Sequence, residues 1–221
     1  MERHEGSVEP VAPDPAAGER YLLLADISGY TSFMAGVVRD HGSDFSAGIP
    51  AAYGILSGLL GSVTEGLEPD FAVVKLEGDA VFAAAPAAAL DGKGDHVLDG
   101  LEAMYRAFIN HRTAAIPSVD HVCNSCPYVA DLDLKVVVHR GPSVRQPIGS
   151  SSDLLGPAVT VAHRLLKNTV REQIGNRPYL LLTADAATAL GLPAIGVAHQ
   201  DEYPDVGHID SRVVELDARP D

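Results

Sequence analysis

The chain has 221 residues, of which 30 are Asp or Glu and 16 are Lys or Arg, so its formal net charge is −14. Nucleic-acid binding through phosphates needs a basic surface, and this acidic balance argues against one. The same excess of carboxylates repels anionic lipid headgroups, and no stretch approaches the roughly 18 consecutive apolar residues of a membrane helix. We therefore expect neither a nucleic-acid partner nor a membrane partner.

The N-terminal segment differs in composition from the rest of the chain. Residues 1–19 are rich in Pro, Ala and charged side chains and lack the apolar segment of a secretory signal. They predict a disordered leader, and residues 20–221 predict a single domain. Two cysteines, Cys123 and Cys126, are too few for a disulfide framework, which predicts a cytoplasmic location.

The hydrophobic pattern predicts the elements in chain order. Tyr21–Ala25 is apolar throughout, which is typical of a buried central strand. Expected after it are helices at 28–39 and 49–67, strands at 71–76 and 79–84 around a Glu77-Gly78 turn, a helix at 96–111, a strand at 132–139, a loop at 147–153, a helix at 156–169, a strand at 179–182, a helix at 184–190 and two β-segments within 194–217. This order predicts an α+β fold with a ferredoxin-like βαββαβ core, helices on one face and extra C-terminal strands.

Two carboxylates are candidate metal ligands in this topology. Asp26 ends the first strand and Asp79 begins the third, and these strands are antiparallel neighbours in a βαββαβ sheet. Carboxylates that close together need a shared proton or a bound cation, and Mg²⁺ takes one or two carboxylates plus substrate phosphates. The alternative is that Asp26 is an acid at a helix start and Asp79 is a turn residue.

The segment after Asp26 is a candidate phosphate site. It reads Ser28-Gly29-Tyr30-Thr31, where we expect a helix to begin. The free N–H groups of a helix start attract anions such as a polyphosphate.

Four segments together resemble the class III nucleotidyl cyclases, the adenylate/guanylate cyclase catalytic domain. Leu24–Phe33 resembles the family's first metal motif, and Lys75–Asp79 is similar to its Lys-x-x-Gly-Asp hairpin. Val138–Gly141 resembles the strand that ends in His-x-Gly. Gly156–Leu165 resembles the helix with the pattern Gly-Asp-x-Val-Asn-x-Ala-x-Arg-Leu. The segments occur in family order over residues 21–167, most of the chain.

The resemblance implies a head-to-tail homodimer that binds a nucleoside triphosphate and cyclises it to a 3′,5′-cyclic nucleotide, with release of pyrophosphate. Asp26 and Asp79 would hold two Mg²⁺ or Mn²⁺ ions per site, with the Ile27 carbonyl as a further ligand. From the other subunit, Lys75 would contact the base and Arg164 would stabilise the phosphate charge in the transition state. Because the net charge opposes an anionic nucleotide, we expect binding to depend strongly on divalent ions.

Two positions depart from the family pattern. The family's base-reading acid falls on Pro157, which has no hydrogen-bonding side chain, and its ribose-orienting Asn falls on Thr160, which keeps a hydroxyl. These departures leave the base unassigned and motivate an alternative, a catalytically inactive cyclase-like domain that senses nucleotides or other small ligands or serves as an interaction domain. For single residues, Arg164 could instead form a surface ion pair and Lys75 could be a solvated strand residue, whereas for His139 we favour a structural hydrogen bond.

A cysteine-containing insertion is expected at residues 116–130. Its Cys123 and Cys126 have Cys-x₂-Cys spacing, with His121 nearby and His111 ten residues before His121. A structural Zn²⁺ needs four such ligands. A single Cys pair is a weak zinc signal, and we favour two reduced loop thiols over a zinc site.

Overall fold

The computed structural model describes residues 16–46, 48–116 and 126–217. The strands are β1 (Ala17–Ser28), β2 (Ala72–Glu77), β3 (Ala80–Pro86), β4 (Asp133–Ile148), β5 (Ser151–Leu155), β6 (Tyr179–Thr183), β7 (Val197–Tyr203) and β8 (Gly207–Glu215). The helices are α1 (Tyr30–His41), α2 (Ala51–Leu67), α3 (Ala87–Leu90), α4 (Gly94–Ala115), the 3₁₀ helix η2 (Cys126–Asp131), α5 (Pro157–Leu165), α6 (Val170–Ile174) and α7 (Ala184–Ala189).

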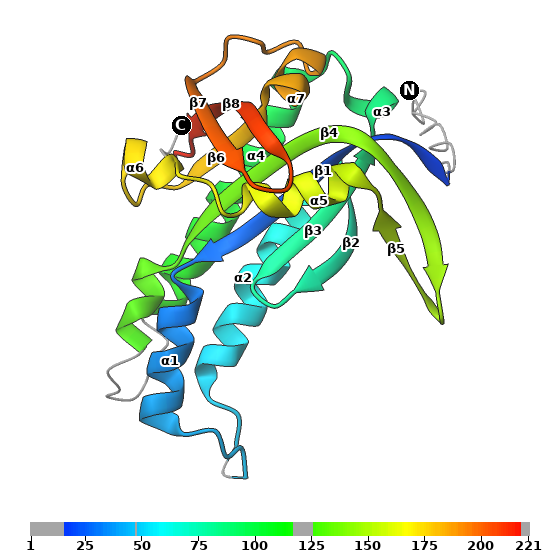
Figure 1. Cartoon of the computed structure of the whole chain (residues 1–221). Helices are drawn as coiled ribbons and strands as arrows, with labels where there is room; N and C mark the ends of the chain where they lie inside the picture. The colour runs from blue at the N-terminus through cyan, green and yellow to red at the C-terminus, as the bar shows by residue number, and fades with distance from the viewer. Residues whose placement is uncertain (1–15, 47, 117–125, 218–221) are drawn as a thin grey trace, which may run out of the picture.

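The strands form one sheet in the order β2-β3-β1-β4-β6-β8-β7, with β5 paired to β4 (Figure 1). Strand β1 runs antiparallel to both β3 and β4, so β2-β3-β1-β4 has the strand order of the predicted ferredoxin-like core. Strand β6 adds parallel to β4, and the β7–β8 hairpin extends the sheet further. The predicted α+β class, the core and the extra C-terminal strands are confirmed.

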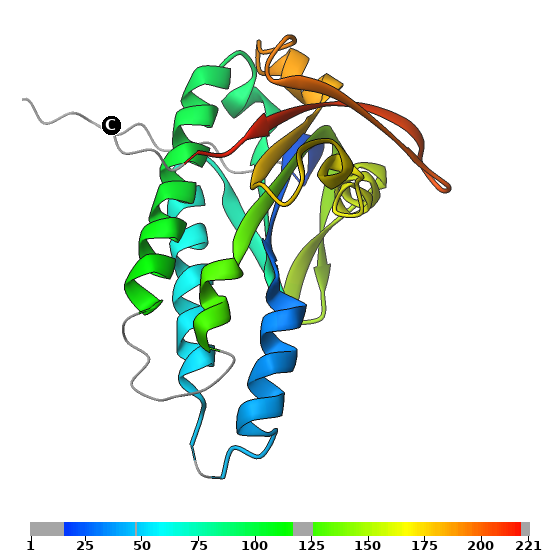
Figure 2. The ribbon, with the colours of Figure 1, turned by 90° about the vertical axis from the view of Figure 1, so that its left-hand side faces the viewer.

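The core lies on both faces of the sheet because β1 is buried on both sides. Tyr21 and Leu23 pack with the face covered by α1, α2 and α4, whereas Leu22 and Leu24 pack with the face covered by α5. Figure 2 shows α2 and α4 on one side of the sheet and α5 on the other. The core helices α1, α2 and α4 therefore share one face as predicted, and α5, which follows the βαββαβ core in the chain, covers the other face.

The sheet is longer at two places than the sequence suggests. Strand β1 begins at Ala17, which pairs with Val144, so residues 17–19 are strand although they were expected within the leader. Residues 147–153, predicted as a loop, instead end β4 and form the β4–β5 hairpin. Their Ser- and Gly-rich sequence carries no strand signal, and pairing with β4 supplies the backbone partners that make a strand of it.

Helix boundaries differ from the prediction where side chains bond to the backbone. The helix expected over 156–169 ends at Leu165, and a separate helix, α6, begins at Val170. The Asn168 amide donates to the Leu165 carbonyl, and its side-chain oxygen accepts the Val170 N–H. Such local bonds compete with helix continuation. Helix α3 was not predicted. Across the described ranges, no helix is both long and apolar enough to cross a membrane.

Candidate functional site

The two predicted metal ligands lie at neighbouring strand ends. Asp26 is opposite Ala80 in the β1–β3 register, and the Ile27 amide donates to the Asp79 carbonyl at 3.1 Å. Asp79 occupies the turn between β2 and β3 together with Gly78, so the turn lies one residue later than predicted and Asp79 precedes the third strand. The predicted convergence of the two positions follows from this register.

The electrostatics of the pair fit a cation site. Burial first and the charge of Asp26 second raise the pKa of Asp79, while Lys135 lowers it. Lys135 Nζ lies 3.0 Å from Asp26 Oδ2, and both side chains are largely buried. Two carboxylates that disfavour each other's charge bind a divalent ion favourably. Among the described residues no group of three or more His, Cys, Asp or Glu gathers, so an ion here would also need carbonyl, water or phosphate oxygens.

The predicted phosphate segment forms the β1–α1 junction. Gly29 is the N-cap of α1 and has φ of 88°, a left-handed conformation that favours glycine. A Cβ there would also lie 3.1 Å from the Asp131 carbonyl oxygen. Ser28 ends β1, and Tyr30 and Thr31 begin the helix, so α1 begins two residues later than predicted. A cavity of about 420 Å³ opens beside this turn and is lined by Gly29, Ser32, Phe33, Arg39, Tyr128 and Asp131.

Lys75 is part of a charged group on β2 and β5. Its Nζ lies 2.6 Å from Asp153 Oδ2 and 3.0 Å from Glu77 Oε1. The hydrogen bond to Asp153 is the main cause that raises the pKa of Lys75, and the same bond lowers the pKa of Asp153. Lys75 is thus ion-paired rather than simply solvated, with 38% of its side chain still exposed.

Asp153, the nearer of the two carboxylates beside Lys75, lies four positions before Pro157, the position that aligns with the family's base-reading acid. Pro157 lies exposed in the first turn of α5, where proline is well tolerated. Asp153 lies in β5, whose pairing with β4 brings it to the face of the sheet that carries Lys75. The β4–β5 hairpin therefore supplies an acid that the motif alignment does not.

Helix α5 carries the two predicted catalytic side chains. Thr160 is exposed, and Arg164 forms an ion pair with Asp205 in the β7–β8 turn. The surface ion pair weighed for Arg164 is present, and both partners are about half exposed, so the guanidinium remains accessible. Lys135 also links the end of α5 to the Asp26–Asp79 pair. Its Nζ donates to the Leu166 carbonyl at 3.2 Å and lies 3.0 Å from Asp26 Oδ2.

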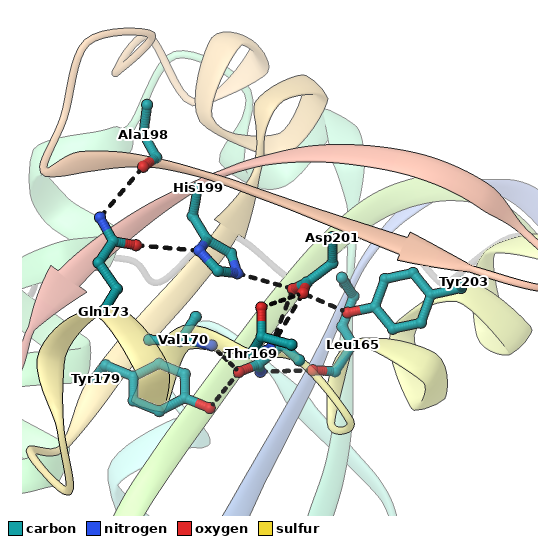
Figure 3. A network of polar contacts seen from close by, with 10 residues as sticks. Leu165, Thr169, Val170, Gln173, Tyr179, Ala198, His199, Asp201 and Tyr203 are labelled. Atoms are coloured by element: carbon teal, nitrogen blue, oxygen red, sulfur yellow. Dashed lines mark hydrogen bonds and ion pairs between the residues drawn. The ribbon is translucent and has the colours of Figure 1, made fainter.

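A buried polar network fixes the turn that follows α5 (Figure 3). The Asp201 carboxylate of β7 accepts hydrogen bonds from the Thr169 hydroxyl at 2.6 Å, from His199 Nε2 at 2.8 Å and from the Tyr203 hydroxyl at 3.3 Å. Burial alone would raise the pKa of Asp201, but the bonds from Thr169 and His199 outweigh it, and the pKa is lowered. The network ties the C-terminal hairpin to the segment that ends α5.

His139 has the structural role that we favoured for it. Its Nδ1 lies 3.2 Å from the Thr183 hydroxyl, which also caps α7 by accepting the Ala186 N–H. Burial lowers the pKa of His139 to about 4, so the ring is neutral at physiological pH.

The zinc hypothesis lies mostly outside the described residues. Residues 117–125 are not described, and they include His121 and Cys123. Cys126 begins η2, and His111 is an exposed residue of α4. The zinc site and the reduced thiols both stay predictions.

Two further residues enter the site only through the structure. Lys135 is predicted as part of a strand, but only the strand register, which pairs it with Asp26, shows that its ammonium lies beside Asp26 and Asp79. Asp153 stands in a stretch predicted as a loop. The signal available for Lys135 was its position on the strand that ends in His-x-Gly; for Asp153 it was Gly149, a turn residue before a short apolar run.

Solved cyclase structures have this fold. The chain is similar to the guanylyl cyclase Cya2, with a TM-score of 0.64 and 12% identity over 91% of this chain and 94% of that chain. It is also similar to the adenylyl cyclase CyaB from P. aeruginosa, with a TM-score of 0.59 and 12% identity over 90% and 95%. A bacterial light-regulated adenylyl cyclase is similar with a TM-score of 0.61 and 18% identity, over 94% of this chain and 55% of the cyclase chain. The chain therefore spans about half the length of that cyclase. The fold is that of the class III cyclase catalytic domain.

Sequence comparison identifies the family to which the chain belongs. The model of a family described as a protein of unknown function (DUF2652) matches residues 56–174, more than half of the chain, and the chain belongs to this family. It is also 28% identical over 148 residues to the "Uncharacterized protein Rv2561/Rv2562" of Mycobacterium tuberculosis (strain ATCC 25618 / H37Rv), which covers 65% of this chain and 66% of that protein. The chain therefore spans slightly less than two thirds of that relative.

Proposed function

We propose that the protein is a divalent-metal-dependent nucleotidyl cyclase that converts a purine nucleoside triphosphate to its 3′,5′-cyclic monophosphate and pyrophosphate. The observation that carries this proposal is the pairing of Asp26 with Asp79 at adjacent strand ends of a cyclase fold, where burial and mutual repulsion raise the pKa of Asp79. A cation would relieve both effects.

Asp26 and Asp79 would hold Mg²⁺ or Mn²⁺, with the Ile27 carbonyl as a further oxygen ligand. A bound divalent ion supplies a lowered pKa for the ribose 3′-hydroxyl and neutralises part of the triphosphate charge. Lys135, whose ammonium already lies 3.0 Å from Asp26, would remain as a fixed positive charge beside the phosphates. The N–H groups at the start of α1 would bind the phosphates, since helix starts favour anions.

The reaction forms one bond and breaks one. The ribose 3′-oxygen attacks the α-phosphorus, the bond from the α-phosphorus to the bridging oxygen breaks, and pyrophosphate leaves with that oxygen. The proton of the 3′-hydroxyl passes to solvent. Arg164 would exchange its exposed partner Asp205 for the phosphate oxygens, and its planar donors match the charge that develops there. Thr160, one turn earlier on α5, would orient the ribose through its hydroxyl.

The base would be read by Lys75 and Asp153. The ammonium only donates hydrogen bonds and the carboxylate only accepts them. Adenine presents one acceptor, N1, beside one donor, the N6 amine, which this pair matches one to one. Guanine presents the O6 acceptor beside two donors, N1–H and the N2 amine, and one carboxylate can accept both donors through its two oxygens. The Lys75–Asp153 pair therefore fits either purine, and the assay compares ATP with GTP.

The active site would be completed by a second copy of the chain. In one protomer β3 lies between β1, which carries Asp26, and β2, which carries Lys75. A head-to-tail homodimer would place the base-reading pair and Arg164 of one protomer opposite the metal pair of the other, giving two equivalent sites.

The test is incubation of the purified protein with ATP or GTP and Mn²⁺, with chromatography of the cyclic nucleotide and an assay of pyrophosphate. We expect the two products in equal amounts and a loss of at least about 100-fold in Asp26→Asn, because a ligand to the reacting centre is removed. Asp99→Asn, an exposed position on α4, is the matched control and should keep full activity.

Two results would overturn the proposal. Equal product formation by Asp26→Asn and the wild type would show that the metal pair is not involved. Calorimetry that finds Mn²⁺-dependent binding of triphosphate, without cyclic nucleotide from any of the four nucleotides, would instead define a nucleotide sensor.

A further inference from the structure

The β7–β8 hairpin places an acidic side chain against a proposed catalytic arginine. Asp205 lies in the turn between Tyr203 and Gly207, and its Oδ2 accepts a hydrogen bond from Arg164 Nη2. The side chains of Arg164 and Asp205 are 41% and 49% exposed. An ion pair that faces water to this extent is weak, so a stronger anion can replace the carboxylate.

The hairpin holds Asp205 at a defined place beside α5. The Val206 N–H closes the turn by donating to the Tyr203 carbonyl at 3.2 Å. Val206 also packs against the apolar cluster that includes Leu165 of α5. On β7, the buried Asp201 carboxylate ties the strand to the segment after α5 (Figure 3). The hairpin is therefore anchored at its turn and along β7, and both anchors keep Asp205 next to the helix.

The Asp205 carboxylate opposes an anion at Arg164 in either of two binding modes. A guanidinium has five N–H donors, and the hydrogen bond to Asp205 uses Nη2. If a phosphate replaces the carboxylate, binding costs the ion pair. If the phosphate binds to the remaining donors, it lies close to a second anion, and like charges at that distance repel each other. Both modes weaken the phosphate contact, so the sign of the effect is the same.

We propose that Asp205 is a positioning residue that competes with the substrate phosphates for Arg164, so that the β7–β8 turn keeps the guanidinium paired until a nucleotide binds. This inference rests on the proposed function, because it adds regulation to the same site. Its consequence is specific. Removal of the Asp205 carboxylate should strengthen the binding of a triphosphate, although it removes an ion pair of the folded chain.

The first experiment measures kcat and KM for ATP and for GTP with Mn²⁺ in the wild type, Asp205→Asn and Asp205→Glu. Calorimetry adds the Kd of an ATP analogue with a methylene bridge between the α- and β-phosphates. In Asp205→Asn we expect KM and Kd to fall about threefold, the size typical of an exposed ion pair. The value of kcat should stay similar, because the pair is exchanged before the chemical step. Asp205→Glu keeps a carboxylate and should stay close to the wild type.

A matched control lies in the same hairpin. Asp210→Asn, on β8, removes the same charge from a side chain that is 60% exposed, and it should leave KM and Kd unchanged. Asparagine is common in turns, so Asp205→Asn suits its position. Asp205→Ala is a second variant without the carboxylate and should behave like Asp205→Asn.

A second readout needs no catalysis. Phenylglyoxal attacks the uncharged guanidine, and a carboxylate partner disfavours that form. Mass spectrometry of the nucleotide-free protein should show modification of Arg164 about threefold faster in Asp205→Asn than in the wild type, again the size typical of an exposed ion pair. Arg177, which pairs with Glu215, serves as the internal reference and should react equally in all variants.

The outcomes separate the two proposals. If Asp205→Asn and Asp205→Ala keep the wild-type KM, Kd and Arg164 reactivity, the competition is overturned, while cyclic nucleotide made by the wild type still supports the cyclase function. A fall of kcat/KM in Asp205→Asn would show that Asp205 orients Arg164 for catalysis, which also overturns the competition. If neither the wild type nor Asp205→Asn binds or converts a triphosphate with Mn²⁺, both proposals fall.

Discussion

Asp79 is the residue at which burial and a like charge act together. Its carboxylate is partly removed from water, and Asp26 adds a second negative charge that Lys135 only partly offsets. Both effects favour the protonated form of Asp79, so its pKa is raised in the folded protein. An acid with a raised pKa in the folded state weakens the fold as it ionises. The ionised Asp79 carboxylate therefore destabilises the fold at neutral pH, and the proposed cation would relieve this effect.

Asp79→Asn should make the metal-free protein more stable at pH 7, by about 0.5 kcal/mol, the size typical of exposed charge interactions. In the wild type the unfolded state loses the Asp79 proton at lower pH than the folded state. The contribution of Asp79 to the free energy of unfolding therefore falls as the pH rises from 3.8, the ordinary pKa of an Asp side chain, through the raised pKa of the folded state. Asp79→Asn does not titrate and should not show this loss of stability. Denaturant unfolding in EDTA from pH 3.5 to 7 measures the difference.

The same variant should lose the rise in Tm that Mn²⁺ gives to the wild type. Asp99→Asn, at an exposed position, serves as the control and should keep both the pH dependence and the response to Mn²⁺. A stability difference between Asp79→Asn and the wild type that does not change with pH would contradict the assignment of the raised pKa.

Among the elements, the C-terminal hairpin has a part in positioning α5. Asp201 of β7 accepts bonds from both the amide and the hydroxyl of Thr169, four residues after the end of α5. Its side chain and that of His199 are 8% and 7% exposed, so these bonds are made away from water. A buried acceptor of this kind, once removed, leaves several donors without partners. The helix that carries Thr160 and Arg164 thus depends on a strand about 40 residues later.

Asp201→Asn should destabilise the protein by about 1–3 kcal/mol at pH 7, because charged hydrogen bonds in a buried site are lost. Because the pKa of Asp201 is lowered in the folded state, its carboxylate stabilises the fold fully at pH values above 3.8, the ordinary pKa of an Asp side chain. This contribution is lost as the pH falls through the lowered pKa. The gap between variant and wild type should therefore narrow in acid. Urea unfolding at pH 7 and pH 3 measures it, with the exposed Asp210→Asn as control. An equal gap at both pH values would show that charge is not responsible.

For the whole molecule, the net charge of −14 bears on the approach of a triphosphate to the proposed site. An acidic molecule repels a free triphosphate, and a site with two carboxylates adds to that repulsion locally. The proposed site would therefore need cations before a triphosphate approaches, and we expect EDTA to abolish triphosphate binding. Strand β3 lies between β1, which carries Asp26, and β2, which carries Lys75, and the proposed head-to-tail dimer would bring these two residues from different chains to one site.

A mixing experiment tests this arrangement. Asp26→Asn and Lys75→Ala should each be inactive alone, because every site in either homodimer lacks one function. Mixed at equal concentrations, they should recover about a quarter of wild-type activity, since half of the dimers carry one intact site of two. Sedimentation should confirm that all three preparations are dimers. No recovery in a mixture that exchanges subunits would contradict the head-to-tail arrangement.

The sequence alone determined the βαββαβ core, the C-terminal hairpin and the closeness of Asp26 to Asp79. These features depend on local apolar patterns and on the order of strands and helices along the chain, and both can be recognised in the sequence. It did not determine where the polar segments end. Residues 147–153 join the β4–β5 hairpin because backbone pairing outweighs their weak local preference for a loop. The helix after Gly156 ends at Leu165 because the Asn168 side chain bonds to the Leu165 carbonyl.

The tertiary structure alone decided which charges meet. Lys135 is beside Asp26, Asp153 is beside Lys75, and Glu77 is shared between Lys75 and His163. Apart from Lys75 and Glu77, which lie two residues apart on β2, these pairs join residues far apart in the chain, and only the register of the strands and the placement of α5 bring them together. Interactions between exposed charges are largely screened beyond about 8 Å at physiological ionic strength, so the sequence supplies the charged residues but only the fold selects their partners.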